Sequence, residues 1–239
     1  MRLRILFLSV ISIYSSSGYG QDRFVSSELT KVSKAYLAAT DFSADVKVIS
    51  FATEKQLVGQ SLGMGMMRKS KDNYYSKYLD DEMICNNNCT LIIDHSGKIV
   101  SYFDKSSAAK KLSVSNFPSM DSLLKKTDST RYEGIVNGEE RFVLYTGKTA
   151  ILRTELFITP QDHFLRKLIY YYAPNTQDNA YDMYKIEITY VNISLGKVDN
   201  DFFSEKKYID YKNGKPVLKQ EYTAYKLHVG DKFNKKMVE

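Results

Sequence analysis

Apolar and polar residues alternate through residues 149–203 in a pattern that predicts consecutive antiparallel β-strands. From Ile151 to Ile158, every second residue would face the same side of a sheet, and a polar turn at residues 160–163 follows. A second strand is predicted over residues 164–172 and a third over residues 184–193. Because this segment brings no cluster of catalytic residue types, it indicates a sheet and a binding surface.

The chain before this segment begins with a helical pattern and then changes to a strand pattern. Val25, Leu29, Val32 and Tyr36 recur at the spacing of one helix face, which predicts a helix over residues 25–39. Alternation then predicts a strand over residues 41–50. The same alternation, with turn signals between the runs, predicts seven more strands: residues 61–69, 74–79, 82–85, 89–93, 98–103, 131–136 and 141–145.

Two segments differ from this strand pattern. Residues 104–129 are rich in serine and lysine, and Pro118 precedes an apolar edge of Met120, Leu123 and Leu124 that predicts a short helix. Beyond Lys206, the pair Asn213-Gly214 predicts a hairpin turn, and residues 219–229 an added edge strand.

Together these elements predict a mainly β (α+β) fold. We expect a single large antiparallel sheet, curled as an incomplete β-barrel around the N-terminal helix and the short mid-chain helix. Helices that fill the concave face only in part would leave a hydrophobic cleft. We expect one domain over residues 21–239, in which residues 206–239 form a C-terminal extension.

Residues 1–20 have the features of a cleaved signal peptide. Arg2 and Arg4 precede an apolar run at residues 5–14, and small residues at positions 18–20 precede the expected cleavage site. The alternative is an uncleaved anchor, although the run is shorter than the ~20 residues that span a bilayer. We therefore expect an exported, periplasmic protein.

Charge and aromatic content narrow the classes of partner. The formal net charge of +6 is spread along the chain in isolated lysine pairs, so the sequence does not favour nucleic-acid binding. These pairs are either solvated surface or points of transient contact with an anionic membrane surface. The 19 tyrosines fit either ordinary cross-strand pairing or the rim of a partly polar cavity.

The two cysteines, Cys85 and Cys89, are separated by three asparagines. In an exported chain this pair predicts a disulfide that closes a tight hairpin loop. A redox-active pair is a weaker interpretation, because such motifs have two intervening residues and a helix start. Metal binding is weaker still, since no histidine lies nearby to complete a tetrahedral site.

Several apolar residues are candidates for lining the predicted cleft. Leu62, Met64 and Met66 share one face of a strand, while Gly63 and Gly65 would let the sheet bend there. The alternative for the methionines is ordinary core packing. The remaining predicted lining residues lie on other strands: Ile92, Leu156, Ile158 and Tyr170.

The sequence does not indicate an enzyme. His95, His163 and His228 fall beside turns or on a surface strand, and residues 80–82, Asp-Asp-Glu, read as a hairpin turn more readily than as a carboxylate cluster. No nucleophile elbow, phosphate loop or zinc helix is present. We therefore predict no catalytic residue, no metal site and no cofactor.

Several segments of the chain resemble the outer-membrane lipoprotein carrier family, the LolA-like proteins. They are the leading helix, the strand DFSADVKV from Asp41, the strands around residues 149–172, and ITYVNI followed by VDNDFF from Val198. This resemblance implies an incomplete antiparallel barrel capped by helices, whose cavity receives the acyl chains of lipoproteins. Two features depart from the family. The strand at residues 41–50 lacks the arginine that holds the family's lid shut, and the tail from Lys206 extends beyond the match.

The predicted function is accordingly a periplasmic carrier or binding protein that reversibly sequesters acyl chains of lipids or lipoproteins. Its partners would be acylated cargo and envelope proteins. The alternative is a non-enzymatic envelope scaffold or sensor, in which side chains fill the cavity and sheet edges dock onto a protein partner. Cavity occupancy separates the two, because only the carrier would copurify with lipid.

Overall fold

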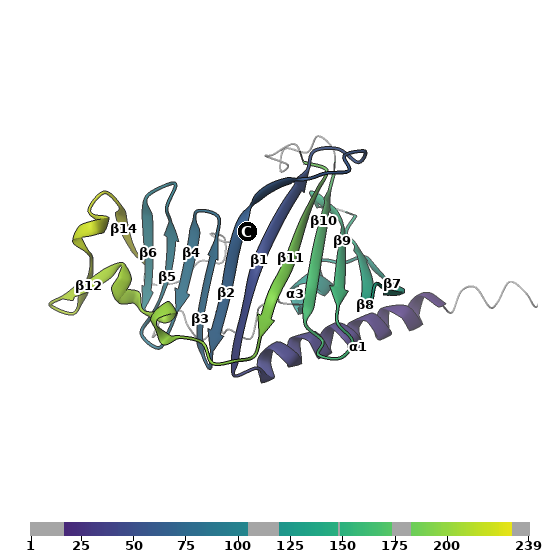
Figure 1. Ribbon diagram of the computed structural model, residues 1–239, viewed down its shortest axis with the longest axis horizontal. Helices are drawn as coiled ribbons and strands as arrows, with labels where there is room; N and C mark the ends of the chain where they lie inside the picture. The colour runs from purple at the N-terminus through teal and green to yellow at the C-terminus, as the bar shows by residue number, and fades with distance from the viewer. Residues whose placement is uncertain (1–16, 105–119, 148, 174–182, 231–239) are drawn as a thin grey trace, which may run out of the picture. The chain divides into compact units, whose positions relative to one another are not determined.

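The computed structural model describes residues 17–104, 120–147, 149–173 and 183–230 (Figure 1). Two α-helices occur within these ranges, and strands dominate the rest. The helices are α1 (Ser17–Ala38) and α3 (Met120–Lys125). The strands are β1 (Asp41–Phe51), β2 (Gln60–Ser70), β3 (Asn73–Tyr78), β4 (Asp81–Cys85), β5 (Cys89–Asp94), β6 (Ile99–Asp104), β7 (Ser129–Val136), β8 (Glu139–Tyr145), β9 (Ile151–Ile158), β10 (Leu165–Tyr172), β11 (Lys185–Ser194), β12 (Ile209–Lys212), β13 (Lys215–Leu218) and β14 (Lys226–Gly230). Short 3-10 turns lie at η2 (Asn200–Phe203), η3 (Glu205–Lys207) and η4 (Gln220–Tyr222).

Hydrogen bonds join twelve of these strands into one sheet in the order β14-β6-β5-β4-β3-β2-β1-β11-β10-β9-β8-β7, and β12 and β13 form a separate pair. The two end strands, β14 and β7, do not pair with each other, so the sheet is open. The predicted mainly β fold with one large, unclosed sheet and two helices is confirmed. The sheet is mixed, however, because β14 pairs with β6 in parallel. Antiparallel hairpins join β1–β6 and β7–β10 in sequence order, whereas β11 lies beside β1 and β14 reaches β6 through a long crossover.

The chain divides into two compact units. The first unit contains Met1–Ala35, Phe51–Leu57 and Ser119–Glu187, and the second contains Tyr36–Ser50, Val58–Pro118 and Ile188–Glu239. The assignment of residues 21–239 to a single domain stays a prediction.

In the first unit, the predicted helix stripe is confirmed as the core of α1. Val25, Leu29 and Val32 are fully buried. Near the start of this helix, the ring of Phe24 packs edge-on against Tyr132 of β7 at 5.1 Å, and Tyr132 lies 5.2 Å from Phe142 of β8. The helix therefore covers the sheet face that carries Phe142. The sheet residues in this core are almost without exposed surface: Phe142, Leu144, Leu156, Ile158 and Leu165.

In the second unit, cross-strand register assigns the residues of β1–β6 to two faces. One face, here called the tail face, is covered by the C-terminal segment (residues 197–225), whose Val198, Phe203, Tyr208 and Ile209 are buried against it. Figure 1 shows this yellow-green segment beside β3 to β6. The sheet residues of the tail face in this core are Tyr75, Ile84, Cys89, Leu91, Ile93, Val100 and Tyr102.

The opposite face of the second unit, here called the helix face, contacts the last turn of α1. The ring of Tyr36 packs edge-on against Phe42 at 5.2 Å. Beside it, the ammonium group of Lys69 donates hydrogen bonds to the carbonyls of Tyr36 at 2.8 Å and Leu37 at 3.4 Å, and to that of Ala39. These carbonyls have no partner within the helix, so a buried cation there completes the helix end.

The C-terminal segment contains the hairpin predicted from Asn213-Gly214. Lys212 pairs with Lys215 across a two-residue turn, and both turn residues have positive φ values, 52° at Asn213 and 75° at Gly214. Such a turn needs left-handed conformations that asparagine and glycine adopt at low cost, so the sequence signal was sufficient. The predicted strand at residues 219–229 is shorter, because η4 occupies its beginning.

Candidate functional site

The predicted lining residues of the second unit do not lie on one face. Asp45 pairs with Met66, and Met66 with Lys77, which places Met66 on the tail face, where it packs against the core under the C-terminal segment. Ile92 pairs with Met83 and belongs to the helix face. A single cavity lined by Met66 and Ile92 is therefore wrong, because one sheet separates the two side chains. Met64 shares the tail face with Met66 and is 58% exposed.

The bend predicted near Leu62 is confirmed as a β-bulge. Val48 pairs with Gly63 and Ile49 with Ser61, so Leu62 is the extra residue on β2. Gly63 has a φ of 146°, and a Cβ on Gly65 would lie 2.5 Å from the backbone oxygen of Lys77. Only glycine permits this close approach of β3.

The predicted lining residues of the first unit belong mostly to its closed core. Leu156 and Ile158 have 0% and 1% of their surface exposed, and they share the core with Phe142. Tyr170 is half-buried, and burial raises its pKa to about 12. Because helix α1 covers this core, Leu156 and Ile158 stabilise the fold and offer no surface to a ligand in this conformation.

The predicted disulfide between Cys85 and Cys89 is wrong, since both thiols are free and buried. Cys85 pairs with Thr90, whose hydroxyl group donates to the Cys85 sulfur at 3.5 Å. Thr90 and Cys85 thus share the helix face, and Cys89, the neighbour of Thr90, points to the tail face. Two thiols on opposite sides of a hairpin cannot bridge without moving the backbone. Burial, with a smaller contribution from Glu205, raises the pKa of Cys89 to about 12.

The helix face of β2–β6 carries apolar side chains in two rows that cross the strands, with Ser76, Thr90 and Ser101 between them. The first row includes Met67, Met83 and Ile92, and Met83 and Ile92 are directly opposed and half-buried. The second row includes Tyr74 at 6% exposure and Phe103 at 4%. A sheet that faces water on one side normally carries polar residues there. On this sheet Met67, Tyr74 and Phe103 of the helix face are buried, whereas Met83 and Ile92 keep part of their apolar surface accessible.

The tail face contains a buried carboxylate, Glu82, whose residue exposure is 2%. Asp80 lies in the predicted turn, the strand predicted from residue 82 is confirmed, and β4 begins one residue earlier, at Asp81. The partners of this carboxylate come from the sheet and from the C-terminal segment: Tyr208 Oη at 2.7 Å, Lys77 Nζ at 3.1 Å, His95 Nε2 at 3.2 Å, Tyr75 Oη at 3.3 Å and Lys207 Nζ at 3.4 Å.

These partners determine what Glu82 can do chemically. Burial alone would raise its pKa, but hydrogen bonds from Tyr208 and Lys77, with the charge of Lys207, outweigh burial and hold the pKa at about 2. A general acid or base works best with a pKa near the operating pH. Glu82 therefore serves to bind the C-terminal segment to the sheet. Sequence reasoning missed this role because its partners are up to 126 residues away.

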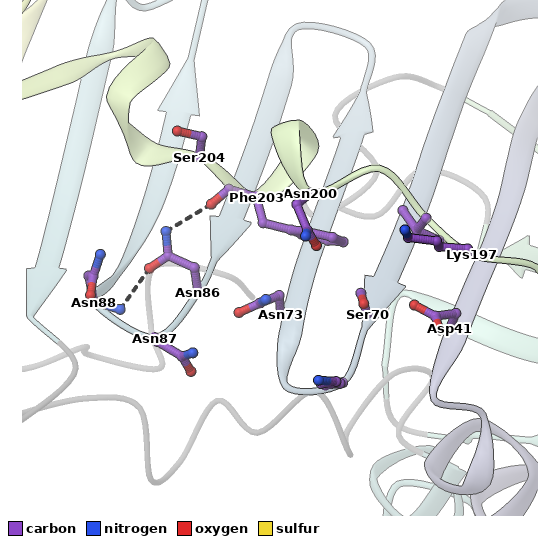
Figure 2. Close-up of a pocket in the computed structure, with 12 residues that line it drawn as sticks. Asp41, Ser70, Asn73, Asn86, Asn87, Asn88, Lys197, Asn200, Phe203 and Ser204 are labelled. Carbon is purple, nitrogen blue, oxygen red and sulfur yellow. Dashed lines mark hydrogen bonds between the residues drawn. The ribbon is translucent and has the colours of Figure 1, made fainter.

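The second unit also contains a polar pocket with a volume of about 700 Å³. Figure 2 shows it between the sheet and the stretch of chain that leads into η2. Its residues come from β1–β3, from the β4–β5 turn and from the start of the C-terminal segment, and most are polar: Asp41, Ser70, Lys71, Asn73, Asn86, Asn87, Asn88, Lys197, Val198, Asn200, Phe203 and Ser204. The sequence analysis did not predict this pocket, because its parts are far apart in the chain.

Clustered metal-ligating side chains and membrane-spanning helices do not occur in the described ranges. Within them, no group of three or more histidine, cysteine, aspartate or glutamate residues is arranged to hold a metal ion. No helix among the described residues has both the length and the apolar character needed to cross a membrane.

Comparisons with known proteins place the chain near several solved structures. An uncharacterized conserved protein from Thermus thermophilus is 9% identical over 74% of this chain and 90% of its own, with a TM-score of 0.45. The lipoprotein LppX of Mycobacterium tuberculosis is 10% identical over 74% of this chain and 98% of its own, with a TM-score of 0.39. A LolA superfamily protein from Nitrosomonas europaea is 10% identical over 76% of this chain and 98% of its own, with a TM-score of 0.32.

The last of these structures belongs to the group that the sequence resembles. No family model matches the chain, and no curated protein matches it. Similarity at this level assigns neither a family nor a ligand, so the function has to come from the chain's own residues.

Proposed function

We propose that this protein is a non-enzymatic, periplasmic binding protein or carrier that holds acyl chains of a lipid or lipoprotein against the helix face of β2–β6. The observation that carries the proposal is the opposed, half-buried pair of Met83 and Ile92, which is flanked in its row by the small side chains of Ser76 and Ser101. Met67, Tyr74 and Phe103 lie on the same face and are already buried, so they form the apolar surroundings of the pair and Met83 and Ile92 supply the accessible surface.

The physical chemistry of this face suits reversible capture. Each methylene group of an acyl chain that leaves water contributes ~0.8 kcal/mol, so one chain can be held without a covalent step. Methionine side chains are flexible and polarisable, which lets the half-buried Met83 adapt to chains of different shape. Because Glu82 is engaged by cations and tyrosines on the other face, binding and release need no acid–base chemistry.

The test is native mass spectrometry with lipid extraction on full-length chain exported by a Gram-negative host. Wild-type protein should carry acylated ligand, and Ile92→Asp and Met83→Asp should lose it because a carboxylate would be buried against the chain. Met64→Asp is the matched control, since Met64 lies on the opposite, tail face and is well exposed. Thermal unfolding checks that each variant is folded, and the milder Met83→Ser covers the case in which the aspartate variants do not fold.

The outcomes separate the alternatives. Ligand lost from Met64→Asp but kept in Ile92→Asp would contradict the helix face and favour the tail face around Met64 and Met66. A folded wild-type protein without ligand, in every preparation, would contradict the carrier. In the same preparation, N-terminal sequencing should give Gln21 as the first residue, as the signal peptide predicts.

The exposed edge of the sheet at β7 favours the scaffold alternative. The edge strand β7 carries two exposed apolar residues, Ile135 at 64% and Val136 at 36%. Such an edge can accept a strand from a protein partner, although the register shift between Tyr132 and Ile135 interrupts regular pairing. Protein captured through β7 from an envelope extract, together with a ligand-free helix face, would support this alternative.

A further inference from the structure

The polar pocket of the second unit is separate from the proposed acyl-binding surface. Asp41 pairs with Ser70 and Ser70 with Asn73, which puts these side chains at the edge of the tail face. Residues 197–204 close the pocket from the other side. Met83 and Ile92 lie on the helix face of the same strands. A ligand in the pocket therefore does not compete with one on the helix face.

One wall of the pocket is held rigidly by Asn86. Its side-chain oxygen accepts hydrogen bonds from the backbone N–H groups of Asn88 at 2.8 Å and Cys89 at 3.0 Å. Its side-chain nitrogen donates to the carbonyl oxygen of Phe203 at 2.8 Å and to the carboxylate of Glu205. Figure 2 shows the bonds to Asn88 and Phe203. The β4–β5 turn and η2 are thus joined, and the pocket is formed before any ligand arrives.

The pocket also has a hydrogen-bonding group that the described residues leave unsatisfied. The side-chain oxygen of Asn73 is buried and has no hydrogen-bond partner among them. Buried polar atoms without a hydrogen bond are uncommon in folded proteins, so this oxygen is a candidate acceptor for a ligand. The carboxamide of Asn200 enters from η2, so the pocket presents amides from both the sheet and the C-terminal segment.

We propose that this pocket binds a neutral, hydroxyl-rich group, of the kind found in a saccharide or in the sugar portion of a glycosylated ligand. A carboxamide has both a donor and an acceptor, and so does a hydroxyl group, which makes the carboxamides of Asn73 and Asn200 complementary to a polyol, while Asn86 and Asn88 hold the wall through their own hydrogen bonds. The volume of about 700 Å³ is within the range for small-molecule sites.

The charges of the lining favour a neutral ligand over a phosphate or carboxylate. Lys71 and Lys197 are exposed, and Asp41 supplies the opposite charge among the lining residues. The lining has no arginine, the side chain that binds phosphate and carboxylate through two parallel hydrogen bonds. An acyl chain is disfavoured as well, because it would bury amide groups without partners.

The test is an NMR titration of the full chain with maltose and with chitobiose, in which the side-chain NH₂ resonances of asparagine report binding directly. At least one sugar should shift the resonances of Asn73 and Asn200. Asn200→Ala should weaken binding about five- to tenfold, the loss expected for one hydrogen bond. Gln60→Ala is the matched control, because it removes an exposed carboxamide of β2 that lies outside the lining and should leave the affinity unchanged.

Two results would overturn the proposal. One is the absence of shifts at the lining asparagines with either sugar. The other is saturation by inorganic phosphate alone, which would identify an anion site. Ile92→Asp keeps this test independent of the acyl-binding proposal, since that variant should lose lipid and retain sugar binding. If Asn200→Ala does not fold, Ser204→Ala at the same side of the pocket replaces it.

Discussion

The hydroxyl group of Tyr208 donates a 2.7 Å hydrogen bond to the carboxylate of Glu82, two residues that are 126 positions apart. This bond joins β4 to the C-terminal segment within the second unit. Both residues are almost without exposed surface, Tyr208 at 0% and Glu82 at 2%. Lys207 adds a second contact from the same segment. The relationship explains how a sheet face rich in apolar residues is kept covered.

Replacing Tyr208 by phenylalanine should destabilise the protein by about 1.5–3 kcal/mol, because it removes a hydrogen bond to a buried charged group while keeping the ring. Urea unfolding measures this change. Tyr211→Phe, on the exposed β12 strand, is the matched control and should cost less. Equal stability of Tyr208→Phe and wild type would show that the bond contributes nothing.

The pKa of Glu82 predicts how stability depends on pH. Its folded-state value, about 2, is below its ordinary value of 4.5, so Glu82 contributes stability that is present above pH 4.5 and is lost as the pH falls toward 2. The loss should approach about 3 kcal/mol, since each pKa unit corresponds to ~1.4 kcal/mol. Urea unfolding at a series of pH values measures it. Asp45 and Asp94 have lowered pKa values too, so the comparison must be with Glu82→Gln, whose profile should be flatter.

Lys69 should stabilise the end of α1. Lys69→Met keeps the length of the side chain but leaves the carbonyls of Tyr36, Leu37 and Ala39 without their donor, so we expect a loss of about 1–3 kcal/mol. Lys47→Met is the control, because Lys47 is exposed on β1. Thermal unfolding followed by circular dichroism compares the two. A larger loss for Lys47→Met than for Lys69→Met would contradict the assigned role.

Both cysteines should remain thiols even in protein isolated from an oxidising compartment. Alkylation with iodoacetamide in denaturant, without a reducing agent, should add two groups per chain by mass spectrometry. In native protein the reaction at Cys89 should be slow, because its pKa is raised to about 12 and the thiolate is the reactive form. A mass that shows an intramolecular disulfide would mean that the β4–β5 turn differs from the arrangement described.

The sequence by itself determined the local elements of this protein. The stripe of α1 around Leu29, the alternation of β1 and the Asn213-Gly214 turn each depend on neighbours within a few residues, so the pattern was enough. The open sheet followed from the order of the elements, because an N-terminal helix and a mid-chain helix were available to cover one of its faces. The face of the sheet on which a side chain lies was harder to predict, because a shift of one residue in strand pairing moves every side chain of that strand to the other face.

Tertiary structure alone decided the sites. The bulge at Leu62, the opposite orientations of Cys85 and Cys89, and the separation of Met66 from Ile92 all follow from pairing between strands. The Glu82 cluster and the asparagine-lined pocket need the C-terminal segment to fold back onto β1–β5, a contact between parts that are 117 to 126 positions apart. Local periodicity contains no information on such contacts, since their free energy arises only when the chain is folded.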